Sequence, residues 1–207
     1  PVSAETSPAS ASAMASKCAI RTSRTNETRW TRRELSRLPI DVKAATAEKA
    51  GRLADAVGDI LPVDVDRGPA YRSFSADLST DLGYLRGIEN FMLDMIDDPK
   101  GLHELVAFMR DGVLAAQAQA EAAGDWGLSA TDNQAVAYAQ ELPDPAANDR
   151  GVTRKQLWTF LAAQEFTLVS PAMHEEFLLA YQRPILENFG LTSYGCCEDL
   201  THKIDML

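Results

Sequence analysis

Apolar residues recur at intervals of three and four over much of the chain, a spacing that predicts amphipathic helices. Residues 46–60 show this pattern, and residues 81–96 repeat it as one helix or as two short ones. The most regular pattern covers residues 98–123. There Asp98-Pro99 is typical of a helix start, and Gly124 is typical of a helix end.

The second half of the chain alternates between helical and extended patterns. Residues 125–130 are typical of a short strand, and residues 152–164 have helical spacing. Residues 166–169 are predicted to be either a strand or the linker before the next helix. Ser170-Pro171 is a second helix start.

The helix predicted after Ser170 contains Pro184, which should kink it, and Gly190 should end it. Residues 191–194 then form a β-prone run. This order of helix, loop and strand favours an α/β fold with parallel strands. Periodicity alone does not distinguish a barrel from a doubly wound sheet.

Charge is unevenly distributed along the 207 residues, whose net charge is −10. Residues 1–40 contain seven Lys or Arg and three acids, a balance of +4, so the remainder has a charge of −14. An acidic body of this kind lacks the clustered cations that phosphate contacts need. We therefore expect no nucleic-acid partner.

The first 28 residues are rich in Ser, Ala and Thr, with few large apolar side chains. Such a segment cannot bury enough surface to offset its ordering entropy, which predicts a disordered tail over residues 1–28 and a folded domain over residues 29–207. The tail resembles a transit peptide, and a processed tail or a cloning remnant fits equally well. The chain starts with Pro and ends in an apolar pattern, so we expect it to be cut from a longer protein.

The expected compartment is the cytoplasm. No apolar run approaches the ~18 residues of a membrane span, and the N-terminus lacks the apolar core of a secretory signal. Three cysteines, two of them adjacent, do not make a disulfide framework, which indicates a reducing environment. Cys18, within the tail, is predicted to be a simple thiol.

Two adjacent cysteines, Cys196 and Cys197, follow the predicted strand 191–194 at its C-terminal end. In parallel α/β folds, catalytic residues collect at that end. Thiolates are strong ligands for soft metals such as Zn²⁺. Adjacent strand residues point to opposite faces, so both can bind one metal only if a turn begins there. The structural alternative is two small buried apolar residues.

Other polar residues have two interpretations each. Glu198 and Asp199 either orient a ligand and take a proton, or serve as carboxylates at a helix N-terminus. Asp132 and Asn133 are either substrate contacts at the same edge as Cys196 or turn-forming residues. The three histidines have no metal-site spacing among themselves: His103 and His174 are expected near the solvent boundary of their helices, and His202 on a surface.

Several common reaction classes lack their motifs. No serine stands in a nucleophile elbow of the Gly-x-Ser-x-Gly type, and no glycine-rich phosphate loop is present. Hydrolase, kinase and dinucleotide-dependent functions are therefore disfavoured.

From about residue 46 onward the chain resembles the uroporphyrinogen decarboxylase-like family, in particular its corrinoid-linked methyltransferase branch. The most specific match is Tyr194-Gly195-Cys196-Cys197-Glu198. The other matching stretches are residues 58–63, 85–95, 141–143, 164–165 and 169–171. The resemblance implies a (β/α)₈ barrel of the TIM type, which this chain would contain in part, truncated at the C-terminus.

In zinc methyltransferases of that family, a His-x-Cys motif and a later cysteine bind zinc, which holds the acceptor thiol as thiolate for attack on a cobalt-bound methyl group. The resemblance places Cys196 on the motif's cysteine and Tyr194 on its histidine, and the later cysteine would lie beyond Leu207. Cys197 or Glu198 is then expected to substitute for the missing ligand. Glu198 and Tyr194 are the expected catalytic residues.

The resemblance implies methyl transfer between a corrinoid protein and a thiol, or a similar small acceptor, with zinc at Cys196 and Cys197. The alternative enzyme is a uroporphyrinogen decarboxylase, which needs no cofactor. Its central aspartate and N-terminal arginines have no clear counterparts here. The third possibility lies outside catalysis: an inactive fragment, or a module that depends on a partner. The sequence does not determine the oligomeric state.

Overall fold

The computed structural model describes residues 42–65, 76–128, 139–144 and 148–207. The chain divides into two units, residues 1–47 and 48–207. The fold considered below is that of the second unit, together with residues 42–47, where a helix begins that continues into it. The predicted tail, Cys18 within it, and the predicted substrate contacts Asp132 and Asn133 all lie outside the described residues.

The first half of the described chain is helical, as predicted. Its helices are α3 (Val42–Val57), α4 (Ser79–Arg86), α5 (Ile88–Asp97) and α6 (Pro99–Ala122). The stretch 81–96 therefore forms two short helices, divided at Gly87, whose φ of +85° favours glycine. Asp98 begins α6 as predicted, because its side chain accepts a hydrogen bond from the Gly101 N–H at 3.1 Å.

The helix predicted over residues 152–164 is wrong. That stretch contains a 3₁₀ turn, Arg154–Gln156, and then strand β1 (Trp158–Leu161), and a second 3₁₀ turn, Gln164–Phe166, begins at its end. β1 is covered on both faces, with Phe160 and Leu161 each at most 1% exposed, so its apolar run resembles one side of a helix. The strand predicted over residues 125–130 is also wrong in its described part, because residues 125–128 have no strand conformation.

The second helix start is confirmed, since the Ser170 hydroxyl accepts a hydrogen bond from the Met173 N–H at 3.3 Å. The helix that follows changes its winding. It consists of α7 (Pro171–His174), a π-helical segment (Glu175–Leu179) and α8 (Ala180–Leu186). The stretch before it, residues 166–169, is a linker and not a strand.

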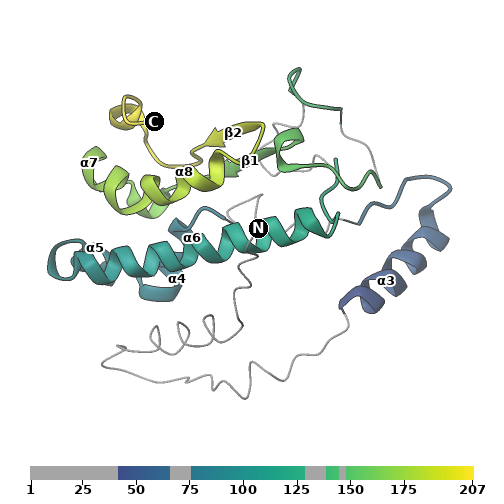
Figure 1. Cartoon of the computed structure of the whole chain (residues 1–207), viewed down its shortest axis with the longest axis horizontal. Coiled ribbons are helices and arrows are strands. Elements are labelled where there is room, and N and C mark those ends of the chain that lie inside the picture. Colours follow the sequence, from purple (N-terminus) through teal and green to yellow (C-terminus); the bar gives the residue numbers. More distant parts are fainter. Residues whose placement is uncertain (1–41, 66–75, 129–138, 145–147) are drawn as a thin grey trace, which may run out of the picture. The chain divides into compact units, whose positions relative to one another are not determined.

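Strand β2 (Leu191–Tyr194) forms where it was predicted and pairs with β1 in parallel, in a register that places Leu161 opposite Tyr194. The parallel pair confirms the α/β class. In the described part of the chain the sheet has two strands and does not form a barrel, so the barrel stays a prediction. The long helix α6 packs against α8 (Figure 1).

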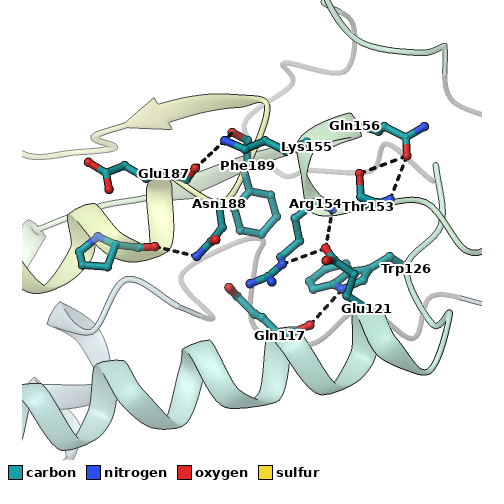
Figure 2. A network of polar contacts seen from close by, with 11 residues as sticks. Gln117, Glu121, Trp126, Thr153, Arg154, Lys155, Gln156, Glu187, Asn188 and Phe189 are labelled. Carbon is teal, nitrogen blue, oxygen red and sulfur yellow. Dashed lines mark hydrogen bonds and ion pairs between the residues drawn. The ribbon is translucent and has the colours of Figure 1, made fainter. Parts of the chain in front are cut away.

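Polar contacts hold the amino ends of the two strands (Figure 2). Glu121 of α6 accepts hydrogen bonds from the backbone N–H and the Nε of Arg154, at 2.8 and 3.0 Å. Lys155 donates to the backbone oxygens of Glu187 and Phe189, at 2.6 and 3.4 Å. The segment before β1 is thereby joined to α6 on one side and to the turn before β2 on the other.

Helix α6 has 24 residues but is not apolar enough to cross a membrane. No other helix in the described residues is both long enough and apolar enough to do so.

The capping contact of Asp98 predicts a measurable loss of stability. Asp98→Ala should lower the free energy of unfolding by about 1 kcal/mol, because the Gly101 N–H loses its acceptor. Urea denaturation would measure the change. The neighbouring exposed residue supplies the control: Asp97→Ala, at the C-terminal end of α5, should leave the stability unchanged or slightly higher. Equal losses in both variants would contradict the capping role.

Candidate functional site

The predicted cysteine pair lies in the loop after β2, residues 195–198, which we call the thiol loop. The loop begins at Gly195, whose φ of +105° would strain any other residue; a Cβ there would also lie 2.5 Å from Leu200 Cδ1 and displace that side chain. This bend ends the alternation of side chains between the two faces of the strand. The Sγ atoms of Cys196 and Cys197 therefore lie 3.4 Å apart, with Cys197 exposed and Cys196 half-buried.

Glu198 holds the thiol loop to the end of β1. Its Oε1 accepts a hydrogen bond from the Ala163 N–H, and its Oε2 accepts one from the Cys196 N–H, both at 2.8 Å. Both carboxylate oxygens are therefore directed at backbone groups. The carboxylate stands beside the thiols without pointing toward them.

Tyr194, immediately before the loop, belongs to a buried hydrogen-bond chain. The Nε2 of Gln182 donates to two backbone oxygens, that of Asp77 and, at 3.0 Å, that of Ala162. Carbonyl oxygens only accept, so the orientation of the Gln182 amide is fixed. Its Oε1 must then accept the hydroxyl proton of Tyr194, 2.6 Å away.

The direction of these hydrogen bonds determines the tautomer of His174. The Tyr194 hydroxyl has already given its proton to Gln182, so His174 Nε2, 2.8 Å away, must be the protonated nitrogen and donate. His174 is fully buried, and burial together with the nearby Lys203 lowers its pKa to about 4. Its Nδ1 is a buried acceptor without a hydrogen-bond partner among the described residues.

The π-helical segment Glu175–Leu179 allows His174 and Gln182 to reach the same hydroxyl. Eight residues make about 2.2 turns of an α-helix, which would direct the two side chains apart. A π turn, with hydrogen bonds from i to i+5, winds less per residue. The spacing therefore approaches two whole turns, and both side chains contact Tyr194.

Asp77 is a buried carboxyl at the start of α4 and adjoins the same network. Its oxygens accept from the Thr80 N–H and hydroxyl, at 3.1 and 3.0 Å. Burial raises its pKa to about 7, with smaller contributions from the charges of Glu165 and Asp81. Glu165 itself contacts the Ser79 hydroxyl.

Lys203, in the 3₁₀ turn Thr201–Lys203, contacts the linker after β1. Its side chain is buried, and its Nζ donates to the backbone oxygen of Phe166 at 2.6 Å. Burial lowers the pKa of this amine, against the opposing effect of Glu198. Residues 162–166, which follow β1, thus receive contacts from the thiol loop, from Gln182, from α4 and from Lys203.

The structure brings together only part of the predicted site. Cys196, Cys197, Glu198 and Tyr194 lie at the carboxyl edge of the parallel pair, as expected. His174 is buried and bonded to Tyr194, so its predicted place at the solvent boundary is wrong. His202 is exposed, as predicted, and His103 is bonded to Tyr181 at 2.7 Å.

Sequence reasoning missed the buried residues of the network, namely Asp77, Gln182 and Lys203. No local pattern distinguishes them, because each partner is far away in the chain: Gln182 and Asp77 are 105 residues apart. Comparison of the chain with protein-family models, with curated proteins and with solved structures finds no match. The interpretation of the site therefore depends on its own geometry.

The distance between the two sulfurs, which are in thiol–thiol hydrogen-bond contact, is also compatible with two ligands of one metal ion. With Zn–S bonds of about 2.3 Å, two sulfurs on a tetrahedral ion lie roughly 3.8 Å apart, close to the 3.4 Å between the Sγ atoms. The pair thus fits two of the four positions. No group of three or more His, Cys, Asp or Glu side chains suited to a metal occurs in the described ranges.

The raised pKa of Asp77 predicts a pH-dependent stability. A carboxyl whose folded pKa is raised contributes stability that is present in full below pH 3.8 and is lost as pH rises to about 7. Asp77→Asn keeps an acceptor for the Thr80 N–H and has no charge at any pH. Its free energy of unfolding, relative to the natural chain, should therefore increase over that range by up to about 4 kcal/mol.

Urea denaturation at several pH values would measure this difference. The exposed Asp97 provides the control, because Asp97→Asn makes the same chemical change away from the buried cluster. A difference between Asp77→Asn and the natural chain that stays constant from pH 4 to pH 7 would show that Asp77 ionises as an ordinary surface carboxyl does.

Proposed function

We propose that the chain is part of a (β/α)₈ barrel enzyme of the uroporphyrinogen decarboxylase-like kind, which transfers a methyl group between a corrinoid protein and a thiol. The observation that supports this proposal is the thiol pair, two sulfurs 3.4 Å apart at the carboxyl edge of a parallel strand pair. That edge is where barrel enzymes place their chemistry.

The chain's own residues would prepare this site in two ways. Cys196 and Cys197 would supply two soft ligands, and Glu198 would hold the loop by its bonds to Ala163 and Cys196. A zinc ion bound there would keep an acceptor thiol in its thiolate form at neutral pH. Such chemistry needs reduced thiols, which suits the cytoplasm.

The proposed reaction transfers the methyl group from cobalt to sulfur without its bonding electrons. The acceptor thiol loses its proton to solvent when it binds. Its sulfur forms a bond to the methyl carbon with its own electron pair, and the cobalt–carbon bond of the corrinoid breaks with both electrons remaining on cobalt. The product is a methyl thioether, and the corrinoid leaves two electrons richer at cobalt.

The proposal predicts a methyl transfer that depends on Cys196. With zinc, methylcobalamin as donor and 2-mercaptoethanol as acceptor, the chain should produce the methyl thioether, detected by mass spectrometry. Cys196→Ser should lower the rate by more than about 100-fold, because loss of a ligand should exceed the 10- to 100-fold effect of outer-shell partners. Cys18→Ser, the same change in residues 1–28, should have no effect.

Three results would overturn the proposal. Equal rates in Cys196→Ser and the natural chain would show that the thiol pair takes no part. Turnover of a porphyrinogen without added metal, with no methyl transfer, would favour the decarboxylase alternative. Failure of both reactions would favour a module without catalysis, whose state of association a measurement of mass in solution would then establish.

A further inference from the structure

The side chains of Cys196 and Cys197 lie close enough to react with each other. Their Sγ atoms are 3.4 Å apart, and a disulfide bond of about 2.05 Å requires them to approach by roughly 1.4 Å. Cys197 is exposed, so a small oxidant in solution reaches it first, and the half-buried Cys196 stands beside it. This is the arrangement of one thiol that is oxidised and a second thiol that then displaces the oxygen.

A disulfide between neighbours in the chain differs from an ordinary crosslink. The Cα atoms of adjacent residues lie about 3.8 Å apart, below the separation of about 4.4–6.8 Å that most disulfides have. A disulfide here would therefore be strained, and it would also be exposed at Cys197. Strained and exposed disulfides are readily reduced again, which suits a reversible switch and not a permanent crosslink.

Closure of the disulfide would act on the contacts that hold the thiol loop. The ring that it closes contains the peptide bond between the two cysteines, so ψ of Cys196 and φ of Cys197 must rotate. Glu198 accepts hydrogen bonds across this segment, from the Cys196 N–H and from the Ala163 N–H, both at 2.8 Å. When the backbone between Cys196 and Glu198 turns, one carboxylate no longer reaches both partners.

From these contacts we infer that Cys196 and Cys197 form a reversible disulfide with hydroperoxides such as hydrogen peroxide, and that its closure releases the thiol loop from the end of β1. The inference goes beyond the proposed function, because this oxidation needs neither a metal nor a methyl donor. One consequence rests on the proposed function: the oxidised chain has no thiol at either position and transfers no methyl group.

The oxidation proceeds in two steps. The Cys197 sulfur, as the thiolate, bonds to one peroxide oxygen while the O–O bond breaks, and the departing hydroxide takes up the proton that the thiol released. The Cys196 sulfur then bonds to the Cys197 sulfur, the S–O bond breaks, and the second hydroxide leaves as water with the Cys196 proton. Two thiols are oxidised to a disulfide, and one peroxide is reduced to two waters.

Mass spectrometry of the full chain tests the disulfide. Cys18→Ser removes the third cysteine, so a bond within the chain can join only Cys196 and Cys197. After treatment with hydrogen peroxide this variant should lose the mass of two hydrogen atoms, remain a single chain without reductant, and regain the mass with dithiothreitol. The control combines Cys18→Ser with Cys197→Ser and should show no such loss. Addition of oxygen without that loss, or a crosslinked dimer, would overturn the inference.

Hydrogen exchange of single amides, followed by NMR, tests the release of the loop. The Ala163 N–H should exchange at least about 10-fold faster in the oxidised chain, because it loses its Glu198 acceptor. The Thr153 N–H supplies the control, since it also bonds a side-chain oxygen, that of Gln156 at 2.9 Å, on the amino side of β1. Its exchange should not change.

Glu198→Ala in the reduced chain should reproduce the faster exchange at Ala163, because it removes the same acceptor. Equal exchange at Ala163 in the oxidised and reduced chains would show that the disulfide closes without moving the loop, and would overturn the inferred release.

The switch and the proposed reaction can fail independently. A disulfide in a chain that transfers no methyl group would sustain the switch and refute the reaction. Methyl transfer by a reduced chain that forms no disulfide would sustain the reaction and refute the switch.

Discussion

The carboxyl edge of the parallel strand pair depends on the hydrogen bonds of one side-chain amide, that of Gln182. It is fully buried and joins three segments: the start of α4 through the Asp77 oxygen, the end of β1 through the Ala162 oxygen, and the end of β2 through Tyr194. Because two of these partners can only accept, the amide has one possible orientation. A single uncharged side chain therefore determines the direction of the hydrogen bonds from Tyr194 and from His174.

Local signals predicted much of the fold. Asp98-Pro99 and Ser170-Pro171 begin helices because a side-chain oxygen and a proline satisfy the first turn without help from the rest of the chain. β1, in contrast, was wrongly predicted as a helix because its residues contain no local signal of a strand. Its residues are apolar on both faces because tertiary packing covers both, and that run has no period of its own.

In the candidate site, too, local features were predictable and contacts between distant residues were not. The thiol loop was predictable because its chemistry is contained in adjacent residues, and the bend at Gly195 decides that both sulfurs share one side. The burial of the polar residues His174, Gln182 and Asp77 was not predictable, since a sequence pattern does not show which distant group will form a hydrogen bond with a polar side chain.

The widened winding of Glu175–Leu179 has a further consequence. A regular α-helix over the same residues would rotate either His174 or Gln182 away from Tyr194 and leave a buried donor or acceptor unpaired, at a cost of about 1–3 kcal/mol. The irregular backbone is thus maintained by side chains at its two ends. The winding of this helix and the direction of the hydrogen bonds through Tyr194 therefore depend on each other, and neither can change alone.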